Sequence, residues 1–292
     1  MSDYENAIVI NGLTKKYDGF TLDNVSFSVP KGSIMGFIGQ NGAGKTTTIK
    51  ALLNVIRPDS GTIEMLGMDN STHELEIKEH IAAVFDEIPF HESFTADMLS
   101  VMFGGMYSTW DEKTYNAYLE RFGLPRKKKL GKFSKGMKMK LQIATALSHG
   151  ARLLIMDEAT TGLDPVVRNE ILDIFHEYLQ DDENSILMSS HITSDLEKIA
   201  DCVTFIDKGK ILLTGYKDEI LDSHGVIKCT KDDFAKLARE DYVSARINDF
   251  GAEAMVSDRA EAKRRYPGMM IEKTTLEEIM LFYVNRDKKE WA

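Results

Sequence analysis

Cysteine and long apolar runs are both scarce in this sequence. Its 292 residues include 2 cysteines, Cys202 and Cys229, which have neither metal-ligand spacing nor the number needed for a disulfide framework. Both lie in apolar stretches, so we expect buried, reduced thiols in a cytosolic compartment. No run approaches the roughly 20 apolar residues of a membrane-spanning helix, and residues 1–6 lack the features of a secretory signal. If the protein acts at a membrane, another chain must span it.

A surplus of basic charge is also lacking. The chain has 36 Lys and Arg against 46 Asp and Glu, which gives a formal net charge of -10. Nucleic-acid binders carry an overall or local basic surplus that releases counterions from phosphates. The composition therefore argues against nucleic acid as a partner. With 43% hydrophobic and 28% charged residues, it is typical of a globular protein of one large or two ordinary domains.

Short apolar runs alternate with helical patterns over most of the chain. The runs Ile34–Ile38, 153–156 and 186–189 are apolar almost throughout, as in central strands that are covered on both faces. Strands that alternate with helices favour an α/β fold with parallel pairing and helical crossovers. Further strands are expected at 7–10, 25–29, 62–66, 81–85, 203–206 and 211–213, and helices at 45–55, 96–107, 112–121, 135–148, 166–179 and 194–199.

Two changes of pattern predict how the chain is divided. Between about residues 86 and 140 the strand signals stop, and we interpret this stretch as a helical subdomain inserted into the α/β core. After about residue 222 polar helical patterns appear at 231–239 and 260–265, followed by an amphipathic helix at 274–284. We therefore predict one domain over residues 1–222 and a C-terminal accessory region over 223–292.

A glycine-rich loop follows the strand Ile34–Ile38 directly. It matches the pattern G-x-x-x-x-G-K-[ST], and its residues are Gly39, Gln40, Asn41, Gly42, Ala43, Gly44, Lys45 and Thr46, with Thr47 next. The glycines let the backbone curl so that N–H groups point at phosphate oxygens, and the helix that begins at Lys45 adds its positive end. We expect Lys45 to reach the β- and γ-phosphates and the Thr46 hydroxyl to bind Mg²⁺.

Two acidic residues end the apolar run 153–156. The carboxyl end of a central strand lies at the sheet edge where ligands bind. Asp157 is expected to hold Mg²⁺, directly or through water, while Glu158 polarises a water for attack on the γ-phosphorus. A pair of solvated acids at a strand end is the alternative, which the neighbouring phosphate loop disfavours.

These motifs, in this order, resemble the nucleotide-binding subunits of ABC transporters over about residues 8–221. Residues 133–137 (Phe-Ser-Lys-Gly-Met) resemble the family's signature sequence, residues 157–164 its Walker B and D-loop run, and residues 189–191 (Ser-Ser-His) its switch-histidine motif. Tyr17 falls where the family places an aromatic ring that stacks on adenine. The resemblance implies a P-loop NTPase core with a mixed sheet, ATP and Mg²⁺ as ligands, and ATP hydrolysis.

The resemblance also implies roles across a dimer. Ser134 and Gly136, at the start of the helix 135–148, would face the γ-phosphate bound on a second ATP-binding subunit, an identical chain or a close relative. His191 would hydrogen-bond the γ-phosphate and hold the attacking water, and Asp164 would link the two sites. A separate membrane-spanning permease would complete the machine at the cytoplasmic face of the membrane.

Two positions depart from the family's pattern. The residue that aligns with the usual γ-phosphate-sensing Gln is Asp86, for which water-mediated contact with Mg²⁺ is the expectation. In the signature, Lys135 and Met137 replace the common Gly and Gln. We expect these departures to slow turnover without abolishing it.

Two surface features have two interpretations each. Met98, Met102 and Met106 repeat at four-residue spacing amid aromatic residues, which indicates either core packing or a groove for a short helix of a membrane partner. The basic run 126–129, with further lysines up to 140, is either a solvated face or a patch attracted to an anionic membrane.

Among possible functions, the motor of a membrane exporter is favoured. The continuous chain and the closing segment 274–280 resemble ABC-2-type exporters of antimicrobial peptides or lipid-linked molecules. The alternatives are the motor of an importer and a soluble ABC ATPase acting on ribosomes or DNA. Against the latter, the chain has one ATP cassette, no long coiled-coil insertion and no zinc cysteines. A GTPase is disfavoured because no Asn-Lys-x-Asp motif occurs.

Overall fold

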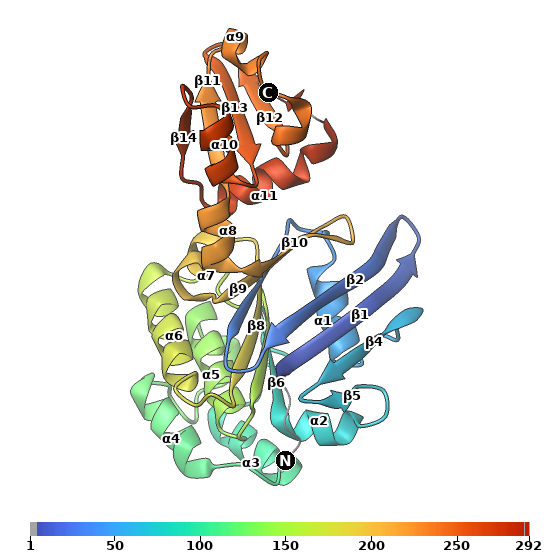
Figure 1. Ribbon diagram of the computed structural model, residues 1–292. Coiled ribbons are helices and arrows are strands. Elements are labelled where there is room, and N and C mark those ends of the chain that lie inside the picture. The colour runs from blue at the N-terminus through green and yellow to red at the C-terminus, as the bar shows by residue number, and fades with distance from the viewer. Residues whose placement is uncertain (1–4, 289, 292) are drawn as a thin grey trace.

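A six-stranded mixed sheet forms the centre of the ATP-site half of the protein. The computed structural model (Figure 1) describes residues 5–288, 290 and 291, so most of the polar N-terminal segment 1–6 lies outside the described residues. The sheet has the order β10-β9-β3-β8-β7-β6. Its strands are β3 (Ile34–Ile38), β6 (Ile81–Phe85), β7 (Leu153–Asp157), β8 (Ser185–Ser190), β9 (Cys202–Asp207) and β10 (Lys210–Tyr216). All pairs are parallel except β9–β10, which confirms the predicted α/β fold with a mixed sheet.

The central strands are apolar throughout because both faces of the sheet are covered. Ile34 and Ile38 of β3 belong to the core that contains the helices α5 (Lys135–Leu147) and α6 (Pro165–Tyr178), whereas Met35 and Phe37 belong to a second core on the opposite face. That second core is completed by α1 (Lys45–Leu52) and an antiparallel sheet (Figure 1). The antiparallel sheet has the order β2-β1-β4-β5, formed by β1 (Asn6–Tyr17), β2 (Phe20–Pro30), β4 (Ser60–Met65) and β5 (Met68–Asp69).

The helices lie close to their predicted positions. They are α3 (Ala96–Met106), α4 (Glu112–Arg121), α5 (Lys135–Leu147), α6 (Pro165–Tyr178) and α7 (Thr193–Ile199). Helix α1 ends at Leu52, three residues before the predicted end. Two helices, α2 (Glu74–His80) and α8 (Lys217–Ser223), have no counterpart in the prediction. Within the described part of the chain, none of the helices combines the length and apolarity required to cross a bilayer.

The C-terminal region is a sheet with helices, which the polar helical patterns did not predict. Its five strands are ordered β14-β11-β13-β12-β15, and they are β11 (Gly225–Cys229), β12 (Ala245–Asn248), β13 (Gly251–Val256), β14 (Met270–Glu272) and β15 (Glu290–Trp291). The predicted helix 231–239 is wrong, since α9 (Lys231–Phe234) covers only its first turn. The helices α10 (Arg259–Arg265) and α11 (Leu276–Val284) match the prediction. The strands are short, and β12 and β13 contain Ala, which has a low intrinsic preference for β structure.

The C-terminal sheet packs on the rest of the chain through α11. Leu276 and Ile279 of α11 share a core with Leu196 and Ile199 of α7. The backbone N–H of Leu276 also donates to Glu197 Oε1 at 2.6 Å. In Figure 1 the C-terminal unit stands above the ATP-site half and is joined to it by α8. Helix α7 follows the strand that carries the switch-histidine motif, and the C-terminal unit contacts the second half of this helix.

Candidate functional site

The glycine-rich loop connects β3 to α1 in a conformation that requires glycine. Gly42 and Gly44 have φ angles of +79° and +119°, in the left-handed region. At Gly39 a Cβ atom would lie 2.5 Å from the carbonyl oxygen of Ile206 on β9. The loop is therefore shaped by backbone geometry and by close packing against the neighbouring strand, as the sequence pattern predicts.

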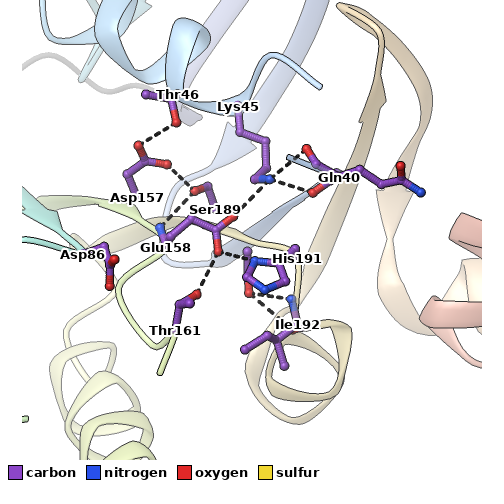
Figure 2. A network of polar contacts seen from close by, with 12 residues as sticks. Gln40, Lys45, Thr46, Asp86, Asp157, Glu158, Thr161, Ser189, His191 and Ile192 are labelled. Carbon is purple, nitrogen blue, oxygen red and sulfur yellow. Dashed lines mark hydrogen bonds and ion pairs between the residues drawn. The ribbon is translucent and has the colours of Figure 1, made fainter. Parts of the chain in front are cut away.

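The side chain of Lys45, the first residue of α1, points back into this loop, and the residue is only 4% exposed. Its ammonium donates to the carbonyl oxygens of Gly39 at 2.6 Å and Gln40 at 3.3 Å. It also lies 3.0 Å from Glu158 Oε1. A buried ammonium needs such partners because desolvation of an unpaired charge is costly. The loop lysine and the proposed base are thus in direct contact (Figure 2).

Thr46 and Asp157 form an oxygen-rich pair next to Lys45. The Thr46 hydroxyl donates to Asp157 Oδ2 at 2.9 Å, and the Ser189 hydroxyl donates to Asp157 Oδ1 at 2.6 Å. Strand β3 leads into the loop that carries Thr46, and β7 ends at Asp157. Because these two strands flank β8 in the sheet, the two residues meet. Hydroxyl and carboxylate oxygens are the donors that Mg²⁺ accepts, and Mg²⁺ typically takes one or two carboxylates together with substrate phosphates. The residues present therefore fit the predicted ion.

Glu158 is held by side chains from three segments. Its φ is +54°, which is unusual for a residue with a side chain. Its backbone N–H donates to the Ser189 hydroxyl at 3.2 Å. The carboxylate accepts from Thr161 Oγ1 at 2.9 Å and from His191 Nδ1 at 2.6 Å, in addition to Lys45. Figure 2 shows Lys45, His191 and Thr161 converging on this carboxylate.

These contacts keep Glu158 ionised. Burial raises the pKa of the Glu158 carboxyl, but the hydrogen bond and charge of Lys45, with Thr161 and His191, outweigh burial and hold the pKa below its ordinary value. A carboxylate with a lowered pKa is a proton acceptor throughout the neutral range. Glu158 is therefore charged where a general base must be charged.

A cavity of about 470 Å³ opens over the loop. Its lining residues are Gly19, Phe20, Gln40, Asn41, Gly42, Gly44, Lys45, Thr46, Thr47 and Glu158. Tyr17 is not among them; its ring is 46% exposed and lies 5.9 Å from the Lys15 ammonium. The predicted role of Tyr17 as an adenine platform therefore stays a prediction.

Phe20 is a lining residue that the sequence analysis missed. It pairs with Tyr17 across the hairpin of β1 and β2, whose two-residue turn is Asp18-Gly19. Asp-Gly between two strands is a strong hairpin signal. The Asp-Gly signal predicts this hairpin and, with it, the position of Phe20 opposite Tyr17.

The signature residues and Asp164 lie apart from the Lys45 cluster. Ser134 caps α5 by accepting from the backbone N–H of Met137 at 3.2 Å, and Asp164 caps α6 by accepting from Val166 and Val167. Gly136 packs next to Val167. Among the described residues, no hydrogen bond or ion pair joins Ser134 or Asp164 to Lys45 or Glu158.

Asp86, the predicted metal contact, is paired elsewhere. Its backbone N–H donates to the Asp157 carbonyl oxygen at 3.1 Å, but its carboxylate forms an ion pair with Lys135. In Figure 2 the Asp86 carboxylate points away from Asp157. The expected water-mediated contact with Mg²⁺ stays a prediction, and the pairing with Lys135 was not foreseen.

Comparisons with known proteins identify the family of this chain. The family model "ABC transporter" matches residues 22–161. The bacitracin transport ATP-binding protein BcrA of Bacillus licheniformis is 39% identical over 203 residues, which are 68% of this chain and 66% of that protein. The lantibiotic transport ATP-binding protein SrtF of Streptococcus pyogenes is 36% identical, with 70% of this chain and 88% of that protein covered.

A solved structure gives the same result for the fold. The structure of an ATP-binding subunit of an ABC transporter superposes with a TM-score of 0.67 at 27% identity, covering 73% of this chain and 91% of that chain. Members of the matched family hydrolyse ATP. This chain therefore belongs to the ATP-binding subunits of ABC transporters.

Proposed function

We propose that this chain is the motor of a membrane exporter and that it hydrolyses MgATP between two head-to-tail copies. The observation that carries the proposal is the contact network in which Lys45, Thr161 and His191 converge on the ionised Glu158, next to the Thr46–Asp157 pair. The proposal for export rests on the similarity to the bacitracin and lantibiotic transport proteins.

The chemistry assigns a role to each side chain. Lys45 and the N–H groups of the loop bind the triphosphate, and Mg²⁺, held by Thr46 and Asp157, would neutralise phosphate charge. Glu158 accepts a proton from the attacking water, while His191 orients Glu158 through its Nδ1–H. Because Lys45 contacts Glu158 directly, a triphosphate that attracts the ammonium also frees Glu158 to bind water.

The exposed positions of Ser134 and Asp164 support the proposal of a second copy of the chain. Ser134 begins α5, whose first N–H groups suit an anion, whereas Asp164 itself accepts from the first N–H groups of α6. Neither Ser134 nor Asp164 contacts the Lys45 cluster of its own chain. We propose that Ser134 faces the nucleotide of the other copy and that Asp164 links the two sites. Light scattering with and without MgATP tests this: a mass that doubles in MgATP supports it, and a monomer under saturating MgATP contradicts it.

An apolar groove in the helical subdomain supports a membrane partner. It encloses about 520 Å³ and is lined mainly by aromatic and Met side chains, including Phe90, Phe94, Met102, Phe103, Met106 and Tyr107. One of these lining residues, Met106, is 61% exposed. Exposed apolar surface of this kind is typical of a protein interface. We propose that a short amphipathic helix of the permease occupies it, which places the chain at the cytoplasmic face of the membrane.

The division of the chain follows from this assignment. We propose that residues 1–222 form the ATP-binding domain, with the helical subdomain of about residues 86–140 as its contact with the permease. Residues 223–292 form an accessory unit, because their strands pair only within their own sheet.

A charge placed in the groove should detach the chain from the membrane. We expect Met106→Glu to lower the membrane-bound fraction at least about 10-fold, since burying an unpaired carboxylate costs more than 1.4 kcal/mol. Hydrolysis by the purified chain should be unchanged. The measurement is the amount of chain in the membrane pellet of its own host.

Leu75→Glu is the matched control, because Leu75 is 83% exposed on α2 and does not line the groove. If both variants stay in the pellet at the unsubstituted level, the groove is not the docking site. Recovery of the chain with ribosomes or DNA would favour a non-membrane target.

A further inference from the structure

Two side chains of helix α5 contact the end of strand β6 and the residue that follows it. Gln142 is 5% exposed, and its amide donates to the Phe85 carbonyl oxygen at 3.0 Å and accepts from the Phe85 N–H at 3.2 Å. The next residue of the strand end, Asp86, forms its ion pair with Lys135. Lys135 and Gln142 are seven residues apart, so they lie on one face of the helix. Two consecutive residues of the strand end are thus held by one helix.

The Asp86–Lys135 pair joins three segments of the site. Asp86 is bound through its backbone to Asp157, which carries the predicted metal ligand. Lys135 is the first residue of α5, directly after the signature Ser134. The Lys135 side chain also passes the loop after β7, because a Cβ atom at Gly162 would lie 3.3 Å from Lys135 Nζ. The ammonium therefore lies where the strand end, the signature helix and the loop towards Asp164 meet.

The pair is exposed enough to contribute little to folding. The Asp86 and Lys135 side chains are 40% and 42% exposed, and ion pairs at such positions are mostly weak. The pair instead affects the charge near the nucleotide. A carboxylate without a paired cation would repel a triphosphate, and an ammonium without a paired anion would attract it. Both positions depart from the family's pattern, in which neutral Gln and Gly are usual, and here the two charges cancel.

We propose that Asp86 and Lys135 act as one unit in which each compensates for the other. Lys135 is a positioning residue that neutralises Asp86 and ties the signature helix to the strand end beside the MgATP site. This inference rests on the proposed MgATP site. We therefore expect the protein to tolerate the exchange of both residues together, but not the substitution of either one alone.

A charge-reversal cycle tests the proposal. The four proteins are the unsubstituted chain, Asp86→Lys, Lys135→Asp and the double variant, and the measurements are KM for MgATP and kcat. We expect Lys135→Asp to raise KM and Asp86→Lys to lower it, each about two- to five-fold, the range of a single exposed charge contact. Each single variant should lose kcat by a similar factor because like charges then face each other. The double variant should recover kcat to within about two-fold.

Two results separate this role from a merely structural one. The opposite shifts of KM should shrink in 0.5 M salt, because salt screens exposed charges, whereas a folding defect would lower activity at every salt concentration. Lys78→Asp is the matched control, since Lys78 forms an exposed ion pair with Glu74 on α2, away from the site, and its kinetic constants should not change. Shifts of KM in the same direction, or a double variant whose kcat loss equals the product of the single losses, would overturn the proposal. Absence of MgATP hydrolysis by the unsubstituted chain would instead overturn the MgATP site itself.

Discussion

Glu158→Gln is expected to lower ATP hydrolysis by about 100-fold or more while MgATP still binds, because a general base contributes about 10²- to 10⁴-fold. The amide keeps the size of the side chain and can still accept from Thr161 and His191, but it cannot take a proton from water. It also removes the negative charge beside Lys45, so the ammonium remains available for the phosphates. Nucleotide should therefore stay bound, and the two-copy state should accumulate. Phosphate release under multiple and single turnover, with light scattering in MgATP, measures both effects.

Glu177→Gln serves as the control for this substitution. Glu177 is 55% exposed and forms an ion pair with Arg121 on the surface of the helical layer, so its loss should leave hydrolysis unchanged. Undiminished phosphate release by Glu158→Gln would show that another group, or water alone, takes the proton.

Lys45→Ala should weaken MgATP binding by about 100-fold, since removal of one partner from a buried charge pair costs about 2–5 kcal/mol. The ammonium is the buried cation of the loop, and the backbone N–H groups alone cannot match its charge. A fluorescent ATP analogue in the presence of Mg²⁺ gives the dissociation constant. Binding by Lys45→Ala at the unsubstituted affinity would count decisively against the phosphate-loop assignment.

The same substitution should change how stability depends on pH. Lys45 is the largest of the influences that lower the pKa of Glu158, and burial is the influence that raises it. A lowered pKa stabilises the fold above the unfolded pKa, near 4.5, and this contribution is lost as pH falls through the folded value. The variant should therefore be less stable than the unsubstituted chain at pH 7. The difference between their free energies of unfolding should become smaller towards pH 4. Urea unfolding across this range measures it, and Lys50→Ala, an exposed lysine on the same helix, should show no such trend.

The parts of the site that sequence predicts are those encoded by consecutive residues. The loop around Lys45 depends on glycines whose φ angles are local, and the strand before it is marked by its own apolar run. Asp157 and Glu158 end an equally clear strand. Caps such as Ser134 and Asp164 are also local, because each accepts from N–H groups two or three residues on.

The basic run shows where a local pattern is insufficient. From sequence it is either a solvated face or a membrane patch. In the structure Arg126, Lys135 and Lys140 pair with Asp97, Asp86 and Glu170 respectively. Three of the eight basic residues of the run are therefore paired with acids that are distant in the sequence, and both interpretations of the run stay predictions.

By itself, the sequence determined that this protein has a glycine-rich loop before a helix, an acidic strand end, a helix capped by Ser134 and an α/β core, because each is specified by short-range backbone geometry and apolar periodicity. Only the tertiary structure decided which of these residues meet. The sheet order places β8 between β3 and β7, and that order brings Glu158 to Lys45 and His191, 113 and 33 residues away respectively. The same holds for Asp86 with Lys135 and for the short strands of the C-terminal sheet. Such contacts depend on how strands and helices pack, and packing follows from the whole set of buried side chains rather than from any one segment.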